Sequence, residues 1–304
     1  MPPTPVLPTQ GPLTLEKAIR VTAKAFDAAN LDFGHGTDNA VDEASWLLMH
    51  AMGLPVDQAP DYQQAISASD RVRCDELINR RIHERIPLAY LTGSAWFAGH
   101  EFFCDPRALV PRSPLAEFIQ SDFFGLFQDP ASILSQPPLR ILDLCTGGGC
   151  IGLSCALAVP DAQVVCSDLS KDALALARSN VEKHHLHDRV ELIESDLFNN
   201  INGIFDLIIS NPPYVDAADI AAMPDEFHAE PLMGLAAGDD GLDLVRVMMR
   251  DAPKHLSDRG WMVVEVGNSQ PAMEQAYPNS GLTWLEFTYG GGGVFAVPRA
   301  ELLN

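Results

Sequence analysis

The sequence has 304 residues, which suits two domains better than one. It is 47% hydrophobic, enough for a core, and its formal net charge is −21 at pH 7. Binding of bare nucleic acid needs clustered Lys and Arg, so this charge argues against it. The charge favours solubility or a basic protein partner. No stretch approaches 18 uncharged apolar residues, so we expect no membrane span.

The N-terminal stretch 1–12 is rich in proline and lacks both the basic segment and the apolar segment of a signal peptide. It predicts a disordered tail. The chain has six cysteines, and none of them forms a C-x-x-C pair. Their spacing therefore predicts no metal site. Reduced thiols are the simpler interpretation, and they indicate a cytoplasmic protein.

Apolar residues recur at helical spacing through 13–88, which predicts a small helical N-terminal domain. Asp38 or Asn39 can begin the second helix, and Ser67 or Ser69 can begin the third, because short polar side chains cap helix N-termini. The three helices are expected over 13–30, 38–53 and 67–86.

The stretch 89–112 alternates aromatic and small residues around Gly99. This pattern predicts a β-hairpin that links two domains. Ser113 and Pro114 follow it and are typical of a helix N-terminus.

From 113 to 304 the expected elements alternate between strand and helix, which is typical of an α/β domain. Helices between the first five strands imply a parallel sheet with helices on both faces. The last two strands are separated only by Tyr289 and the glycine run Gly290–Gly293. That connection is too short for a helical crossover, so these strands should pair antiparallel. The seven strands are expected over 140–146, 163–168, 189–195, 205–210, 260–267, 282–288 and 293–298.

A glycine-rich loop follows the first of these strands, with Asp143 inside the strand and Gly147, Gly149 and Gly152 after it. Glycines at this place let the backbone pass close to a ligand beside a helix N-terminus. The three glycines match G-x-G-x-x-G, which NAD enzymes also contain. However, the Asp143 carboxylate can accept hydrogen bonds from the amino group of S-adenosylmethionine, and a pyrophosphate has no such group. The context favours S-adenosylmethionine, while a plain strand-to-helix turn stays an alternative.

Two further acids end the next two strands. Asp168 can bind both hydroxyls of a ribose, as acids do at this point of nucleotide-binding sheets; its alternative role is a helix N-cap. Asp196 can accept a hydrogen bond from an adenine amino group while Leu197 packs on the ring; the alternative is a loop acid beside a core leucine. Ribose and adenine occur in both candidate cofactors, so these residues do not separate them.

Asn211-Pro212-Pro213-Tyr214 directly follows the fourth strand. An amide or aromatic amine is a poor nucleophile because its nitrogen lone pair is delocalised, so an enzyme must hold that nitrogen in line with the sulfonium methyl. The Asn211 side-chain oxygen and the Pro212 carbonyl can each accept one N–H, and the prolines fix the backbone between them. The Tyr214 ring can stack on the flat target group and favour the cationic methyl. The motif predicts methyl transfer to an amide or amino nitrogen.

At this point the chain resembles the HemK-type protein glutamine methyltransferases over nearly everything after residue 12. Besides the motifs above, the resemblance rests on Leu109–Pro114, Glu230-Pro-Leu, Gly238–Leu242 and Glu265–Asn268. It implies a class I, Rossmann-like methyltransferase sheet of seven strands with an antiparallel last strand. A small helical N-terminal domain over 13–88 and a hairpin linker over 89–112 precede the methyltransferase domain over 113–304.

Three segments, Phe33–Asn39, Ala95–Phe102 and Trp284–Phe287, resemble the branch of this family that methylates a glutamine of the large-subunit ribosomal protein L-three. The other main branch methylates the Gly-Gly-Gln glutamine of peptide release factors. It usually has Gly where this chain has Cys145, and Ser is common in the family where this chain has Gly148. Neither departure affects the expected cofactor site.

The resemblance implies transfer of a methyl group from S-adenosylmethionine to a ribosomal-protein glutamine, with release factors or an exocyclic nucleobase amine as alternative targets. A binding module or an NAD oxidoreductase would be a different class of protein. The expected partner is a basic protein, either free or within an assembling large subunit, and no free nucleic acid or membrane is expected. Catalysis is assigned to Asn211, Pro212 and Tyr214, and substrate binding to these residues with Pro213. Cofactor binding is assigned to Asp143, Thr146, Gly147, Gly149, Asp168, Leu169, Asp196, Leu197 and Asn211.

Overall fold

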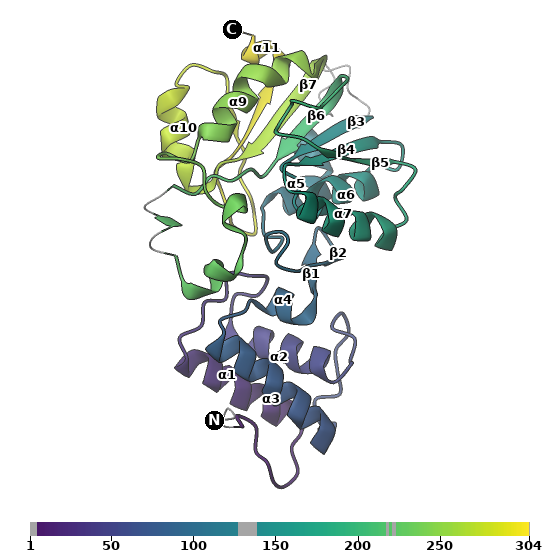
Figure 1. The fold of residues 1–304 in the computed structure, drawn as a ribbon, viewed down its shortest axis with the longest axis vertical. Helices are drawn as coiled ribbons and strands as arrows, with labels where there is room; N and C mark the ends of the chain where they lie inside the picture. Colours follow the sequence, from purple (N-terminus) through teal and green to yellow (C-terminus); the bar gives the residue numbers. More distant parts are fainter. Residues whose placement is uncertain (1–4, 127–138, 217–218, 221–222, 304) are drawn as a thin grey trace. The chain divides into compact units, whose positions relative to one another are not determined.

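The computed structural model describes residues 5–126, 139–216, 219–220 and 223–303 (Figure 1). By its internal contacts the chain divides into two compact units. The helical unit comprises Met1–Ser94 and Pro224–Ala229, and the sheet unit comprises Ala95–Met223 and Glu230–Asn304. The segment Pro224–Ala229 thus packs with the helical residues although it lies far along the chain.

The helical unit is built on α1 (Leu15–Ala28), α2 (Ala40–Ala51), α3 (Ala68–His83) and the short α4 (Leu88–Thr92). The side chain of Asn39 accepts from two backbone N–H groups at the start of α2, and the Ser67 hydroxyl accepts from Asp70 N at the start of α3. Both caps are among those predicted. The helices enclose a core in which Phe26, Leu47 and Ile78 are fully buried.

Residues 5–12 differ from the disordered tail expected from the sequence, whereas 1–4 lie outside the described residues. The backbone N–H groups of Val6 and Leu7 both donate to Asp75 Oδ1 at 2.9 Å. Leu7 is only 2% exposed and joins the core of the helical unit. Together with two hydrogen bonds from Arg71 of α3 to the carbonyls of Pro8 and Gly11, these contacts hold the segment against α3, and the proline content gave no sign of them.

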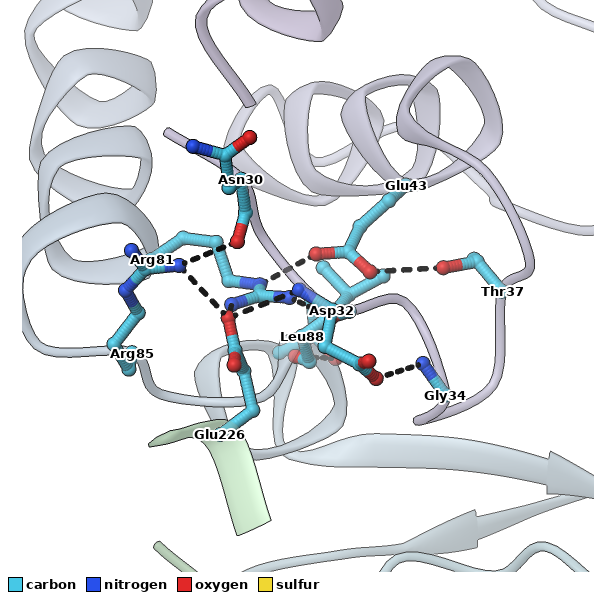
Figure 2. Close-up of polar contacts among 10 residues, drawn as sticks. Asn30, Asp32, Gly34, Thr37, Glu43, Arg81, Arg85, Leu88 and Glu226 are labelled. Atoms are coloured by element: carbon cyan, nitrogen blue, oxygen red, sulfur yellow. Dashed lines mark hydrogen bonds and ion pairs between the residues drawn. The ribbon is translucent and has the colours of Figure 1, made fainter. Parts of the chain in front are cut away.

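Arg81 of α3 is a buried cation at the centre of the helical unit (Figure 2). Its Nε donates to Glu43 Oε1 at 2.5 Å, and its Nη1 lies 3.1 Å from Glu226 Oε1. Its Nη2 donates to the carbonyl of Asp32 at 2.6 Å. The three side chains are at most 2% exposed, so their charges are compensated by one another and not by water.

Glu226 attaches the segment Pro224–Ala229 to the helices (Figure 2). Besides Arg81, its Oε1 accepts from Arg85 Nη1 at 3.2 Å and from Asp32 N at 3.2 Å. The Phe227 ring packs on His35, with ring centroids 4.4 Å apart. His35 belongs to the Phe33–Asn39 segment noted in the sequence, and Asp32 directly precedes it, so part of that region holds the segment Pro224–Ala229.

The sheet unit contains a seven-stranded sheet in the order β5-β4-β3-β6-β7-β9-β8. Strand β9 pairs antiparallel with both β7 and β8, and the five strands from β5 to β7 are parallel, which confirms the predicted sheet with an antiparallel last strand. The strands are β3 (Arg140–Leu144), β4 (Gln163–Asp168), β5 (Val190–Glu194), β6 (Phe205–Ser210), β7 (Leu256–Glu265), β8 (Thr283–Trp284) and β9 (Val294–Pro298).

Helices cover both faces of this sheet (Figure 1). Residues such as Ile141 and Ile209 face a core shared with α5 (Leu115–Gln120), α6 (Cys150–Ala158) and α7 (Lys171–Lys183). Their neighbours in the strands, such as Leu142 and Ile208, face α9 (Asp243–Asp251) and α10 (Gln270–Ala276). The remaining helices are α11 (Arg299–Leu302) and the 3₁₀ turns Asp122–Gly125, Asp225–Ala229, Leu232–Gly234, Ala252–Lys254 and Gly267–Ser269. Within the described residues, no helix is long and apolar enough to cross a membrane.

One predicted helix, between β5 and β6, is absent from the described connection 195–204. Turns replace it, with hydrogen bonds from Asn199 N to Asp196 O and from Ile201 N to Phe198 O. Phe198 and Ile201 are buried in the core on the α9 face. The prediction of a helix here was wrong because this short connection buries its apolar side chains through turns.

The predicted hairpin consists of β1 (Ser94–Phe97) and β2 (His100–Phe103), which form a two-stranded sheet. Ala98 and Gly99 join them and both have positive φ, which matches the right-handed twist of a two-residue hairpin turn. The hairpin strands are confined to 94–103, because α4 occupies the start of the expected range 89–112.

We predict that Arg81→Met lowers the free energy of unfolding by about 3–5 kcal/mol, because it leaves buried carboxylates without their cation. Urea unfolding followed by circular dichroism measures the effect. Arg20→Met is the matched control, since the Arg20–Glu16 pair is 74% and 42% exposed; such a pair contributes about 0–1 kcal/mol. Equal losses in the two variants would contradict the role given to Arg81.

Candidate active site

The predicted site residues follow β3, β4, β5 and β6, whose carboxyl ends lie at one edge of the sheet. Leu144 at the end of β3 pairs with both Ser167 of β4 and Ser210 of β6, and Asp168 pairs with Glu194 of β5. In open α/β sheets this edge is where ligands bind. The register therefore brings together four segments that are far apart in the sequence.

The loop after β3 turns sharply into α6. Gly147 and Gly149 have φ of +55° and +88°, a backbone conformation that glycine adopts without strain. Gly149 N donates to the carbonyl of Thr146 at 2.9 Å, and Gly149 is the N-cap of α6. A Cβ at Gly152 would collide with Cys166 Sγ of β4. Glycine is favoured at Gly147 and Gly149 by their backbone conformation and at Gly152 by close packing. Together the three glycines allow the N-terminus of α6 to lie close to the sheet edge.

Asp143 lies beneath this loop and is fully buried. Its Oδ2 accepts from Thr146 Oγ1 at 2.5 Å and from Gly152 N at 2.9 Å. Its Oδ1 is buried and has no hydrogen-bond partner among the described residues. Burial raises the pKa of this carboxyl to about 7, against the two hydrogen bonds that lower it. Asp143 Oδ2 and Thr146 therefore act on the shape of the loop, while Asp143 Oδ1 keeps open acceptor capacity, and cofactor binding by Asp143 stays a prediction.

Asp168 ends β4 and faces the same loop. Its Oδ2 accepts from Gly147 N and its Oδ1 accepts from Ser170 N, both at 2.8 Å. The N-cap of α7 is Ser170, so Asp168 is not the cap of that helix. Burial raises the pKa of Asp168 while the backbone hydrogen bonds lower it. Leu169 beside it is 54% exposed, an apolar side chain without cover at the edge of the site.

Asp196 and Leu197 follow β5 and differ in exposure. Asp196 is exposed, and its Oδ2 accepts from Asn199 Nδ2 at 3.3 Å. Leu197 is only 8% exposed and belongs to the core on the α9 face, with φ of +45°. Its side chain therefore has little surface left for a ligand.

The Asn-Pro-Pro-Tyr segment begins directly after β6. Ser210 Oγ donates to the carbonyl of Leu144 at 2.6 Å, which ties the end of β6 to the end of β3. The Asn211 side chain is half-buried and makes no hydrogen bond with any residue that the structure describes. Pro212 is buried and Pro213 is half-buried. Asn211 thus has a polar side chain with open hydrogen-bonding capacity beside the glycine loop.

Tyr214 is held by residues that follow β7. Its hydroxyl donates to Glu265 Oε1 at 2.9 Å, and its carbonyl accepts from Ser269 Oγ at 3.0 Å. A Cβ built on Gly267 would meet the Tyr214 ring at 2.5 Å, so the ring lies directly on this glycine. Burial raises the pKa of the Tyr214 phenol well above its usual range, as does the neighbouring Glu265 charge. One side of the ring is therefore occupied by the protein.

Sequence reasoning gave no chemical role to several residues around this motif. Glu265 is 3% exposed and also accepts from Ser113 Oγ at 2.5 Å. Arg112 forms two hydrogen bonds of 2.6 Å with the buried Glu230, whose Oε1 also accepts from Val110 N. The signal that could have found Glu265 is a lone acid at the end of an apolar strand, since a buried acid needs partners.

These residues fit a nucleoside-type cofactor. The glycine loop offers a helix N-terminus, Asp168 and Asp196 offer carboxylate acceptors, and Leu169 offers apolar surface. Among the residues that the structure describes, no group of three or more His, Cys, Asp or Glu could hold a metal ion. The arrangement can bind an adenosyl group and present a polar acceptor, Asn211, at the same edge.

Comparisons with known proteins show which family this chain resembles. Residues 131–230 match the methyltransferase small domain family, and residues 29–93 match the PrmC N-terminal domain family. The ribosomal protein uL3 glutamine methyltransferase of Xanthomonas campestris pv. campestris is 46% identical over 292 residues, covering 95% of this chain and 92% of that protein. The protein of the same name from Xylella fastidiosa is also 46% identical, with coverages of 95% and 91%.

A solved structure supports the fold. The hMettl16 catalytic domain, in complex with an RNA hairpin of the MAT2A 3′UTR, aligns with a TM-score of 0.50 and 17% identity. The alignment covers 79% of this chain and 85% of that one. At this identity the likeness speaks for the class I methyltransferase fold alone.

We predict that Gly152→Ala lowers the free energy of unfolding by about 1–3 kcal/mol, because the new methyl group overpacks the contact with Cys166. Gly148→Ser, in the same loop, is the control. The nearest atom to a Cβ there is Leu176 Cδ2 at 3.3 Å, the end of a flexible side chain, so we expect a change within about 0.5 kcal/mol. Urea unfolding measures both, and a Gly152→Ala protein as stable as the wild type would disprove the close approach.

Proposed function

The chain belongs to the family of the ribosomal protein uL3 glutamine methyltransferases, and from that premise we propose that it methylates the side-chain amide nitrogen of a glutamine in uL3. The methyl donor is S-adenosylmethionine. The observation that carries the proposal is the position of Asn211–Tyr214 at the carboxyl edge of the sheet, beside the glycine loop. Action on a ribosomal protein implies a cytoplasmic enzyme.

S-adenosylmethionine supplies a methyl group on a sulfonium, and the chain's own residues hold the donor. In our proposal Asp168 binds the ribose hydroxyls and Asp196 accepts from the adenine amino group. Leu169 covers the adenosyl group, because it is the apolar side chain left exposed beside Asp168. Gly147 and Gly149 allow the methionine end to approach the N-terminus of α6. Asp143 and Thr146 keep this loop in place from beneath, since their described hydrogen bonds are made within it.

The acceptor is a planar amide, whose nitrogen becomes nucleophilic only as its lone pair leaves conjugation. Asn211 Oδ1 and the Pro212 carbonyl accept the two N–H groups of the glutamine and aim the nitrogen at the methyl group. These acceptors stabilise the positive charge that develops on the nitrogen during transfer. Pro212 and Pro213 restrict the backbone between Asn211 and Tyr214. The proton can leave after transfer, so the mechanism requires no general base.

Tyr214 presents the free side of its ring to the flat acceptor group. The other side rests on Gly267, and the hydroxyl is engaged by Glu265. An aromatic face within about 6 Å of a cationic methyl group is attractive. The ring thus contributes to catalysis as a surface and not through its hydroxyl.

The substrate assignment is supported by charge as well as by similarity. The enzyme carries a formal charge of −21, and ribosomal proteins are basic. Complementary charge raises the rate of encounter and disfavours nucleic acid as a direct target. The amino group of a nucleobase and the glutamine of a release factor remain the competing targets.

The proposal is tested by incubating the enzyme with methyl-labelled S-adenosylmethionine and, separately, purified uL3, a peptide release factor and bare RNA. We expect label on uL3, and peptide mapping should place it on one glutamine side chain. Label on the release factor alone would contradict the assignment of uL3 as the substrate but would agree with glutamine methylation. Label on RNA alone would show that the acceptor is a nucleobase.

A further inference from the structure

Glu265 is a buried acid of the site to which the chemistry described above gives no function. Glu265 is the last residue of β7 and is 3% exposed. Val264 pairs with Ser210 of β6, so Glu265 lies in the register next to the point where the Asn211–Tyr214 motif begins. Removing a carboxyl from water costs free energy unless its oxygens accept hydrogen bonds from the protein. Both oxygens of Glu265 have such partners.

Each Glu265 oxygen accepts from a different hydroxyl group. Oε1 accepts from the Tyr214 phenol at 2.9 Å, and Oε2 accepts from Ser113 Oγ at 2.5 Å. Burial raises the pKa of Glu265 to about 7, opposed by these two hydrogen bonds and by the charge of Arg112. A carboxylate accepts both hydroxyls, whereas a protonated carboxyl has one oxygen that must itself donate. In the charged form both hydroxyls can donate to Glu265 at once, whereas protonation turns one of its oxygens into a donor and weakens this arrangement.

Tyr214 is confined at its other end as well. Ser269 Oγ donates to its carbonyl at 3.0 Å, and its ring lies on Gly267, which has φ of +46°. A Cβ at Gly241 would collide with the same carbonyl. The backbone and one ring face of Tyr214 are thus fixed by packing. The bond to Glu265 is the polar contact that fixes the hydroxyl end of the ring.

On this geometry, and resting on the function proposed above, we propose that Glu265 is a positioning residue for methyl transfer. It holds Tyr214 in the orientation in which the side of the ring away from Gly267 meets the acceptor amide. Through Tyr214 it also holds the acceptors on Asn211 and Pro212, which lie only three and two residues earlier. Glu265 touches neither substrate nor cofactor in this account.

The test compares wild type with Glu265→Gln in steady-state methylation of uL3 between pH 5.5 and 9. Wild-type kcat should fall on the acid side with a midpoint near 7, since the protonated carboxyl loses an acceptor. In Glu265→Gln this decrease of kcat at acid pH, the acid limb of the profile, should vanish. At pH 8 its kcat should be about tenfold lower than that of the wild type, because small misplacements of an acceptor reduce the rate strongly. KM for uL3 and the Kd for S-adenosylmethionine should stay within about threefold, since neither ligand touches Glu265.

Thermal unfolding separates positioning from a purely structural role. A carboxyl whose pKa is raised in the folded state contributes stability that is full below its unfolded value of 4.5 and lost as pH rises through about 7. At pH 8 the wild type therefore bears the cost of a buried charge, and Glu265→Gln should have an equal or higher Tm. A Tm that falls together with kcat would overturn the proposal.

Two further variants complete the test. Tyr214→Phe keeps the ring and removes the hydroxyl, so it should remove the acid limb, and its effect should not add to that of Glu265→Gln. Glu191→Gln, an exposed residue of β5, is the control and should keep the wild-type pH profile. Additive effects, or a Glu265→Gln enzyme with the wild-type kcat and acid limb, would disprove the positioning role. A wild type that methylates no glutamine would instead disprove the proposed function.

Discussion

The whole site depends on the parallel pairing of β3, β4, β5 and β6, which places their carboxyl ends at one edge of the sheet. Side chains that follow parallel strands meet even when they are far apart in the sequence. Here the pairing brings Asp168 to the glycine loop and Ser210, the residue before Asn211, to the end of β3. Adding β7 at the next position brings Glu265 to Tyr214. The proposed positions for the methyl donor and the acceptor thus follow from strand order.

Much of this arrangement can be predicted from local sequence. The strands read from apolar runs and turns correspond to β3 through β9, and the antiparallel last strand follows from the short glycine connection before it. The caps Asn39 and Ser67 follow from the preference of short polar side chains for helix N-termini. Gly147 and Gly149 have the positive φ that a tight turn requires. These features depend on residues that are close together in the sequence, so they can be predicted from the sequence alone.

The features that escaped prediction all depend on partners far along the chain. The ion network of Arg81 joins it to Glu226, 145 residues away, and no local pattern indicates that pairing. Glu265 finds Tyr214 and Ser113 only once β7 has joined β6. The expected helix over 195–204 failed because tertiary burial of Phe198 and Ile201 outweighed local pattern.

The central claim is that Asn211 aims the acceptor amide at a separately bound methyl donor, and one variant tests it most directly. For Asn211→Ala, calorimetry with S-adenosylmethionine should give a Kd within about threefold of wild type, while kcat on uL3 falls about 100-fold or more. Asn279→Ala, at an exposed position outside the site, should match the wild type in both. Unchanged turnover in Asn211→Ala, or a loss of cofactor binding that accounts for the lower rate, would contradict the account.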